Sequence, residues 1–458
     1  MSSFRLPYVA SSSKAWLITI AVFWFFNTFF SNLLLTQVQQ HTVLEKPYTS
    51  FFLTHFTNDG LDSWLTMNEA IQYIAQYPDS LLYQHIFFDE KVKFQYPPTS
   101  LIFLEPFQSL TFAQMLSVLN FLGWVSVWLI GYLSYRIFLI VYRGSQPHSN
   151  LPRSERLLWL ILFLGFTLTF YPFMRSWRLG QTQTFLILLF TAALYCFMTE
   201  RKGWAGIAIG LICAVKPPLA LLAMWGLFRK QWLFVIGMVS MGILILGLSL
   251  YWYGWHNHID YLSVLSYIGK RGEVYYPNQT VNGLLNRLLD NGSSVVWTPN
   301  EFPPYHPMVY FTTLLTSFGL IAGAIVLGIK SGATHPRILL LDFFIASISF
   351  TLAAPVAWEH HYGIIFPMIA TLLALNFRRK PARWEWGLLA VSYFLLSNLF
   401  EITLRWPDSP GNIMQSYVFF SVALLLGYFY WMRRMLYKSY ISQPDATNKD
   451  TANAISPT

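Results

Sequence analysis

The stretch Asn58–Phe107 reads NDGLDSWLTMNEAIQYIAQYPDSLLYQHIFFDEKVKFQYPPTSLIFLEPF and is the first long polar interruption of an otherwise apolar chain. It carries seven of the chain's 21 acidic residues: Asp59, Asp62, Glu69, Asp79, Asp89, Glu90 and Glu105. Carboxylates gathered in one loop between apolar segments indicate chemistry at the membrane surface beneath that loop. The apolar segments are then the scaffold around it.

The composition is that of a polytopic membrane protein. Hydrophobic residues make up 55% of the chain and charged residues 11%, against roughly 25% charged in an average soluble domain. The net charge of +9 comes mostly from Lys and Arg in short loops between apolar runs. There these residues set the topology, so the charge does not indicate a nucleic-acid partner. Cys196 and Cys213 both lie in apolar segments, which argues against a disulfide framework.

Apolar stretches of about 20 residues, oriented by the positive-inside rule, predict an all-α fold with about ten full spans. We expect a cytoplasmic N-terminus (1–14), a transmembrane domain (15–432) and a cytoplasmic, disordered tail (433–458). Large outer loops are expected at about 37–100 and 254–307. The predicted spans are Ala15–Leu35, Gln114–Val141, Leu157–Phe173, Thr184–Met198, Trp232–Tyr253, Met308–Ile329, Ile338–Ala354, Ile364–Phe377, Leu388–Leu404 and Gln415–Trp431, with a half-helix at Leu101–Leu110.

Residues 203–230, GWAGIAIGLICAVKPPLALLAMWGLFRK, are only as long as one and a half spans and are broken at Lys216-Pro217-Pro218. Proline removes a hydrogen-bond donor and cannot continue a helix, so this segment is predicted to fold back on itself with Lys216 at the outer face. The alternative is one tilted span whose lysine reaches the interface. Gly206 and Gly210 have the spacing that allows close helix packing.

With this topology, five separate segments bring acidic, basic and amide side chains to the outer side of the membrane. Their convergence indicates a functional site. Their polar residues are Asp59 and Asp62; Arg175, Arg178 and Gln181; Lys216; Asn278 and Arg287; and Glu359, His360 and His361.

Asp59 and Asp62 are three residues apart and would share one face of a helix. A partly buried carboxylate at this place could act as a general base toward an incoming hydroxyl. The alternative is that both residues cap a surface helix, Ser63–Tyr77. Glu69 is the next candidate base, although we expect it to be solvated.

The cations Arg175, Arg178, Lys216 and Arg287 would suit a phosphate-bearing ligand, and the alternative for the arginines is contact with lipid headgroups. His360 and His361 are adjacent and lack a spaced third ligand, which favours hydrogen bonding to a phosphate or sugar over metal binding. No GxxxxGK, GxGxxG, DxD or CxxC motif is present. Nucleotide chemistry therefore gains no support, and a lipid-linked donor fits an outer site. We expect neither a metal nor another cofactor.

Five motifs in order resemble glycosyltransferase family 87. They are the acidic first loop closing with FQYPPTSLIFLEPF, then RLGQTQTFLILLFTAALY, GWAGIAIGLICAVKPPLALL, PNQTVNGLLNRLL and PVAWEHHYGIIFPMIATLL, and together they extend over about Asp59 to Leu373. The family consists of polyprenyl-phosphate-sugar-dependent enzymes of the GT-C fold, and it includes mycobacterial α-1,2-mannosyltransferases.

The resemblance implies a GT-C-type bundle of about 10–12 transmembrane helices, with an active site built from outer loops of a bacterial plasma membrane protein. It implies inverting transfer of a hexose or pentose, with mannose favoured, from a polyprenyl-phosphate donor to a lipid or glycan acceptor. The family's catalytic aspartate maps onto Asp62, with Asp59 as the fallback. The donor-binding positions map onto Gly180 and Gln181, Lys216, Asn278 to Thr280 with Arg287, and Trp358, His360 and His361.

Three other interpretations remain open: a transporter or flippase of a lipid-linked sugar, a non-catalytic membrane scaffold, and another GT-C enzyme with a protein acceptor. A transporter would show internal repeats and paired broken helices at mid-membrane. This sequence shows one evident break, and its charges lie at one face.

Overall fold

The computed structural model describes residues 13–30, 60–144, 151–298, 301–330, 335–377, 379 and 381–441. Within these residues every regular element is a helix, apart from one isolated antiparallel bridge between Asn278 and Trp358. The prediction of an all-α fold is therefore confirmed. Most of the predicted N-terminal segment, residues 31–59 of the first outer loop and the tail from residue 442 lie outside the described residues.

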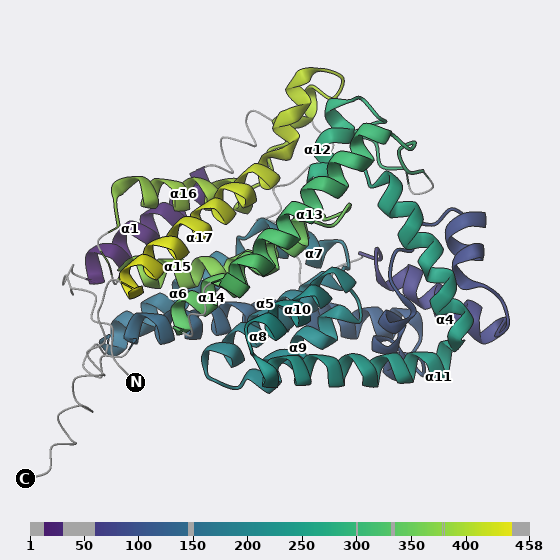
Figure 1. Cartoon of the computed structure of the whole chain (residues 1–458), viewed down its shortest axis with the longest axis horizontal. Helices are drawn as coiled ribbons and strands as arrows, with labels where there is room; N and C mark the ends of the chain where they lie inside the picture. The colour runs from purple at the N-terminus through teal and green to yellow at the C-terminus, as the bar shows by residue number, and fades with distance from the viewer. Residues whose placement is uncertain are drawn as a thin grey trace, which may run out of the picture.

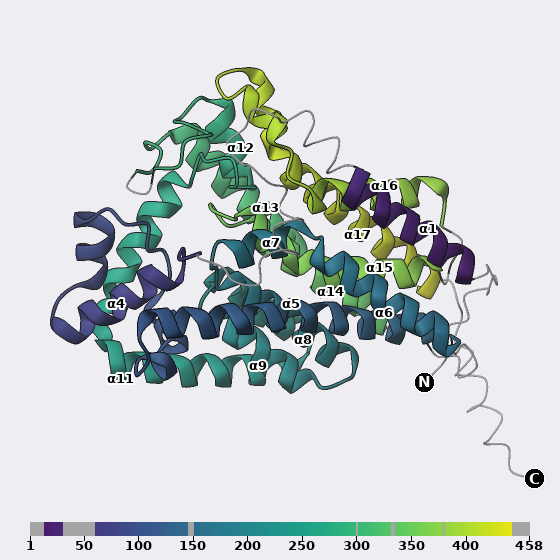
Figure 2. The same ribbon diagram turned by 180° about the vertical axis from the view of Figure 1, so that it is seen from behind.

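One group of helices lies side by side along the lower part of Figures 1 and 2. It comprises α5 (Phe112–Arg143), α8 (Gln183–Met198), α9 (Lys202–Cys213) and the first half of α11 (Trp232–Arg271), and α6 (Arg153–Leu168) packs against α5. These helices share a large core of buried Leu, Ile, Phe and Trp side chains. Burial of that apolar surface holds the group together.

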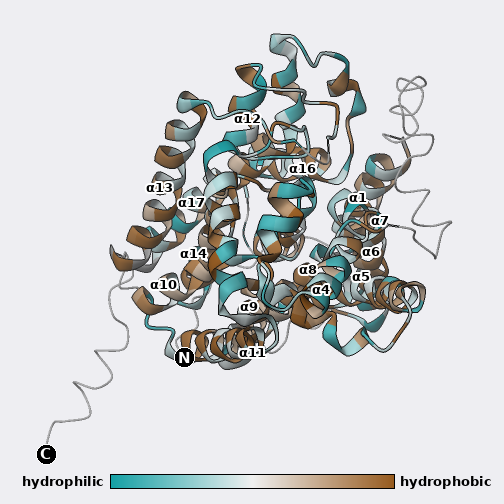
Figure 3. Ribbon diagram, turned by 90° about the vertical axis from the view of Figure 1, so that its right-hand side faces the viewer, coloured by the Kyte–Doolittle hydropathy of each residue, from teal (hydrophilic) through white to brown (hydrophobic). Residues whose placement is uncertain are grey.

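A second group crosses the first at an angle in Figure 1. Its members are α13 (Pro307–Lys330), α14 (Pro336–Leu352), α15 (Ile365–Phe377), α16 (Arg383–Ser397) and α17 (Tyr417–Ile441), together with α1 (Ser13–Phe25) and the π-helical turn η1 (Phe26–Phe30). Because α15 packs against α5, the two groups form one body. The long helices α11 and α13 carry mainly apolar residues (Figure 3), and many of these are exposed, as expected for faces that meet lipid.

By length and composition, five helices of the described chain can cross a membrane, and a sixth is added if α6 and α7 count as one span bent by 52°. Four other apolar helices have only 10–17 residues. Fewer helices of the described residues thus reach full span length than the about ten full spans expected from the sequence. The reason is that several apolar stretches are interrupted by breaks that leave short helices. The five long spans are Phe112–Arg143, Trp232–Arg271, Pro307–Leu327, Glu359–Phe377 and Pro410–Ser439.

The proline break folds back as predicted. The helix α9 ends at Cys213, and a 3₁₀ turn, η5 (Pro217–Ala220), leads into the short α10 (Leu221–Phe228). A Cβ on Gly206 would lie 2.0 Å from the Phe234 oxygen, and one on Gly210 would lie 2.8 Å from the Met238 oxygen. Since α9 and α11 thus run in the same direction in close contact, the chain between them must return, which rules out the single tilted span.

The helix α11 bends at Gly254, whose φ is +70°, and its second half turns toward α12 (Val281–Leu288) in Figure 1. Residues 255–271 of the predicted outer loop 254–307 are thus helical and continue α11 beyond the bend. A second core forms where this half packs against the acidic stretch. That stretch folds into α4 (Trp64–Gln76), η2 (Gln84–Asp89), η3 (Pro98–Phe103) and η4 (Glu105–Phe107). The expected half-helix at Leu101–Leu110 is a pair of 3₁₀ turns.

Four further short helical elements connect longer helices along the chain. They are α7 (Tyr171–Arg178), η6 (Glu359–Ile364), η7 (Glu401–Arg405) and η8 (Pro410–Ser416). The segment around Arg175 and Arg178 was expected to be a turn between two spans. It is a helix of eight residues that leaves α6 at an angle of 52°.

A buried ionic cluster of Arg229, Asp342 and Arg433 links the end of α10 to α14 and α17. Asp342 of α14 contacts Arg229, which follows α10, and accepts a hydrogen bond of 2.7 Å from Arg433 of α17. The three side chains are almost fully buried. One carboxylate thus compensates two guanidinium groups inside the protein, and Arg337 in the first turn is the other charged residue of α14.

We predict that Asp342→Asn strongly destabilises the protein. Removing one partner of a buried charge cluster costs about 3–5 kcal/mol because the remaining charges stay buried without compensation. Thermal unfolding of the purified protein in lipid nanodiscs measures the effect. Glu200→Gln is the control, because the Glu200–Lys202 pair lies at the surface and its loss should cost at most about 1 kcal/mol. Equal unfolding temperatures for the two variants would contradict the structural role of Asp342.

Candidate active site

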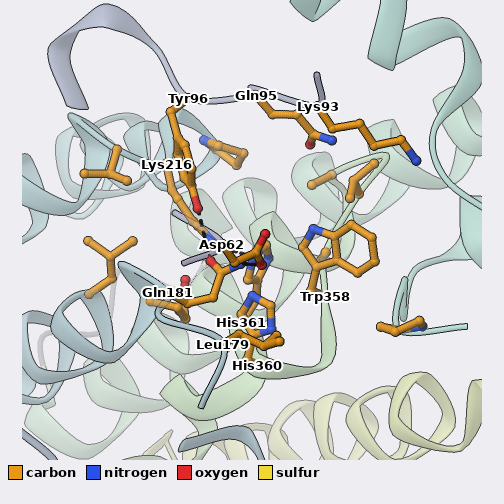
Figure 4. A pocket seen from close by; sticks show the side chains of 18 of the residues that line it. Asp62, Lys93, Gln95, Tyr96, Leu179, Gln181, Lys216, Trp358, His360 and His361 are labelled. Atoms are coloured by element: carbon orange, nitrogen blue, oxygen red, sulfur yellow. Dashed lines mark hydrogen bonds between the residues drawn. The ribbon is translucent and has the colours of Figure 1, made fainter. Parts of the chain in front are cut away.

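A cavity of about 850 Å³ opens among α4, α7, the α9–η5 break, the second half of α11 and the turn before η6. Figure 4 shows its polar side chains converging on Asp62. The polar residues that the sequence predicted for the site and that line this cavity are Asp62, Arg175, Arg178, Gln181, Lys216, His360 and His361, and Trp358, which the family resemblance mapped to the site, lines it as well. The convergence of distant segments is therefore confirmed for these seven residues.

The Asp62 loop is fixed to the α7–α8 turn by its backbone. The Asp62 amide donates to the Leu179 oxygen at 3.0 Å, and the Ser63 amide donates to the Gly180 oxygen at 3.2 Å. A Cβ on Gly60 would lie 2.2 Å from the Arg178 oxygen, and one on Gly180, whose φ is +68°, would lie 2.0 Å from the Gly60 oxygen. Two backbones can approach this closely only where both residues lack a side chain.

Asp62 does not cap the following helix. Ser63 occupies the N-cap position of α4 and makes no side-chain cap, whereas the Asp62 carboxylate accepts a short hydrogen bond from the side-chain amide of Gln181. The Gln181 oxygen in turn accepts from Ser63 Oγ at 3.1 Å and from the Tyr96 hydroxyl at 3.0 Å. The predicted surface helix exists, but the capping alternative is wrong for Asp62. Asp59 lies outside the described residues.

Burial raises the pKa of the Asp62 carboxyl above its ordinary value. The Gln181 hydrogen bond and the nearby charges of Arg175 and Lys216 act in the opposite direction, because they favour the carboxylate. Burial also raises the pKa of Tyr96 to about 12, so this hydroxyl stays protonated as a hydrogen-bond donor. Asp62 thus combines access to the cavity with a pKa moved toward neutrality, as a general base requires.

The cations of the cavity surround Asp62. Lys216 Nζ, at the proline break, makes a short contact with His361 Nε2. Arg175 and Arg178 reach the cavity from α7, one turn apart. His360 is almost fully buried beside His361, with ring centroids 4.9 Å apart, and its Nε2 has no hydrogen-bond partner among the described residues. Within the same residues, no three His, Cys, Asp or Glu side chains cluster in a way that could hold a metal ion.

The Asn278 side chain does not line the cavity. It is fully buried, donates to the Glu273 and Pro355 oxygens at 2.8 and 3.1 Å, and accepts from the Ala357 amide at 3.0 Å. The backbone of residues 277–279 pairs with that of residues 357–359. In this structure the PNQT motif therefore holds the turn that presents His360 and His361, and it acts on the site indirectly.

Arg287 is also placed away from the cavity. Its guanidinium donates to the oxygens of Val274 and Asn278 at 3.3 and 3.1 Å and to Ser416 Oγ at 2.7 Å, and only 1% of the residue is exposed. Burial lowers its pKa to about 9. Through these contacts Arg287 connects the loop that precedes α12 to η8.

Several cavity residues were not predicted from the sequence. Lys93 forms a buried ion pair of 2.6 Å with Glu273, and its Nζ lies 4.0 Å from the centroid of the Trp297 ring. Tyr96, Gln95, Tyr275 and Trp297 also line the cavity. The available signals were the glycines that flank Asp62 and Gln181 and the tyrosine of the FQYPP motif. The aromatic residues gave no distinguishing signal in a chain this rich in Trp and Tyr.

The sequence model of glycosyltransferase family 87 matches residues 94–355, which is more than half of the chain. The chain belongs to glycosyltransferase family 87. It is also similar to the polyprenol-phosphate-mannose-dependent alpha-(1-2)-phosphatidylinositol pentamannoside mannosyltransferase of Mycolicibacterium smegmatis, at 23% identity over 320 residues, or 68% of this chain and 70% of that protein. The family resemblance predicted from the five motifs is confirmed.

Family membership and the apolar helices identify a multi-pass membrane glycosyltransferase. Gln181, Lys216, Arg175 and Arg178 fall within the region that the family model matches, whereas Asp62 precedes it and His361 follows it.

We predict that Gly60→Ala impairs the site without unfolding the protein. The added methyl group would overlap the Arg178 oxygen and push the Asp62 loop away from the α7–α8 turn, a strain that typically costs about 1–3 kcal/mol. Limited proteolysis should cleave the loop faster than in the wild type, and transferase activity should fall. Gly387→Ala is the control, because no atom lies within 4 Å of its added Cβ. Unchanged proteolysis and activity in Gly60→Ala would refute the docking role.

Proposed function

We propose that this protein transfers a hexose, mannose by preference, from a polyprenyl-phosphate donor to a hydroxyl of a lipid or glycan acceptor, with inversion at the anomeric carbon. The observation that carries the proposal is the position of Asp62 in a cavity that joins cationic side chains to an apolar wall. The name of the mycobacterial relative supports mannose and a polyprenol-phosphate carrier. The active site would face outward from a bacterial plasma membrane, where lipid-linked donors replace nucleotide sugars.

In the proposed reaction, Asp62 takes the proton of the acceptor hydroxyl while the hydroxyl oxygen forms a bond to the anomeric carbon. The bond from that carbon to the phosphate oxygen breaks, and polyprenyl phosphate leaves with the bonding electrons. The raised pKa of Asp62 suits this role, because a general base is most effective when its pKa lies near the working pH. Asp59 remains the fallback predicted from sequence.

Lys216, Arg175 and Arg178 would bind the donor phosphate and stabilise the charge that develops on it. Lysine supplies a point charge and arginine a planar fork that matches phosphate oxygens. His361 contacts Lys216 and can orient it, and His360 has an unsatisfied ring nitrogen in the same wall. The sequence-based assignment of Arg287 and Asn278 to the donor becomes a supporting role in this proposal, since both lie behind the cavity wall.

The polyprenyl chain would occupy the aliphatic side of the cavity. Leu186 of α8, Ile212 of α9, Val215 and Leu219 line this side next to Lys216. A phosphate held at Lys216 would therefore have apolar surface directly beside it for the isoprenoid units. This adjacency of charge and aliphatic surface matches the two parts of a lipid-linked donor.

We predict that Asp62→Asn lowers sugar transfer by at least about 100-fold, because general-base catalysis contributes 10²–10⁴ in rate. The assay follows labelled mannose from polyprenyl-phosphate-mannose into membrane lipids with purified protein. Glu69→Gln is the matched control, since this exposed carboxylate of α4 lies outside the cavity lining.

Transfer that survives in Asp62→Asn would move the base to Asp59. Absence of transfer by the wild type would favour a different donor or the transport of a lipid-linked sugar. Label recovered in protein and not in lipid would favour the alternative with a protein acceptor.

The transfer rate should fall on acidification through a pKa above that of an ordinary aspartate, because only the carboxylate of Asp62 can accept the proton. Gln181→Leu removes the hydrogen bond that stabilises the carboxylate, which raises the pKa further and moves the acidic limb of the pH–rate profile to higher pH. Gln183→Leu is the control, because Gln183 lines the cavity without bonding Asp62. An acidic limb unchanged in Gln181→Leu would contradict Asp62 as the titrating group.

A further inference from the structure

Three aromatic rings in contact with one another line the cavity, and we refer to Tyr275, Trp297 and Trp358 as the aromatic wall. Their ring centroids are 5.3 Å (Tyr275–Trp297), 5.5 Å (Trp297–Trp358) and 6.2 Å (Tyr275–Trp358) apart, with interplanar angles of 46° to 69°. The inclined, edge-on contacts are favourable and hold each ring in a fixed orientation.

The wall is anchored from behind by polar contacts. The Trp358 backbone pairs with Asn278. Lys93 lies against the Trp297 ring, and the side chains of Lys93 and its partner Glu273 are only 6% and 3% exposed. A buried ion pair is costly to desolvate, so its presence here is better explained by the position it imposes on Trp297 than by stability.

The wall faces the reacting end of the cavity. Figure 4 shows the Trp358 indole pointing into the cavity beside Asp62 and His361. Lys93 and Gln95 lie on an irregular segment across the cavity (Figure 4). The Gln95 side-chain amide and the Trp358 indole N–H have no hydrogen-bond partner among the described residues. A ligand next to Asp62 would thus meet flat aromatic surface together with unused donors and acceptors.

We propose that the aromatic wall binds a pyranose ring of the acceptor, with Trp358 as the stacking platform. A pyranose has C–H groups on one face, which pack on the negative face of an aromatic ring, and hydroxyl groups around its edge, which Gln95 can bond. This inference rests on the proposed transferase function. It assigns Trp358 to the acceptor, whereas the family resemblance mapped this residue to donor binding, and it makes Trp358 a specificity residue.

A binding experiment tests the wall without any donor. Saturation-transfer NMR on the protein in nanodiscs would use methyl α-D-mannopyranoside, methyl α-D-glucopyranoside and methyl β-D-galactopyranoside, with glycerol as the polyol without a ring. We expect at least one pyranoside to bind the wild type and Trp358→Phe, and binding to be lost in Trp358→Leu, which keeps an apolar side chain but removes the flat ring. Trp204→Ala, at an exposed tryptophan of α9 outside the cavity, is the control. Binding by none of the pyranosides, or equal binding by the Leu and Phe variants, would overturn the proposal.

Kinetics separate the acceptor ring from the donor ring. With polyprenyl-phosphate-mannose and a pyranoside that binds, Trp358→Leu should raise the acceptor KM about tenfold, equivalent to 1.4 kcal/mol, and leave the donor KM unchanged. A rise in the donor KM alone would assign the wall to the donor sugar and overturn the inference. No transfer by the wild type would instead refute the proposed function, while the NMR result would still decide whether the wall binds a sugar.

Discussion

The site depends on the close contact between the backbones of Gly60–Ser63 and Leu179–Gly180. This contact ties Asp62 to the turn between α7 and α8, far along the chain, and not to the helix that follows it. Gln181, on the same turn, then bonds the carboxylate directly. The base, the amide that stabilises its charged form and the two arginines of α7 are therefore one structural unit. A side chain at either glycine would separate them, because there is no room between the two backbones.

A second constraint is that a polar site beside lipid must satisfy its own hydrogen bonds, since the hydrocarbon offers none. Asn278 and Arg287, which lie behind the cavity, show how this requirement is met. Asn278 saturates the turn before η6, and Arg287 bonds three backbone oxygens and η8. These contacts explain why the two residues are polar although they do not reach the cavity. They also hold in place the turn that presents His360 and His361.

The sequence was sufficient to predict the all-α fold, the re-entrant segment and seven of the cavity residues, because each left a direct physical signal: long apolar stretches, consecutive prolines and charges confined to one face. It could not separate Lys216, which faces the cavity, from Arg287, which faces the protein interior, because both are cations on the same side. Residues 255–271 were assigned to an outer loop and their helical conformation was not predicted; this half of α11 packs against η3 and against Leu82 and Tyr83. The aromatic wall was predicted only in part: the family resemblance mapped Trp358 to the site, whereas Tyr275 and Trp297 resemble ordinary interfacial residues in composition.

The distribution of charged side chains in the cavity indicates where the donor phosphate and the acceptor would bind in the proposed reaction. Lys216 and Arg175 lie close to Asp62, with Arg178 in the same cavity lining, whereas Lys93 of this lining is paired with Glu273. An anion is therefore favoured beside Lys216, and a neutral ring is favoured against the aromatic wall. Inverting displacement needs the attacking hydroxyl and the departing phosphate on opposite sides of the anomeric carbon. With the phosphate at Lys216 and the acceptor ring on Trp358, the proposed inversion requires Asp62 to take the proton of the acceptor hydroxyl on the side of the reacting carbon opposite the phosphate.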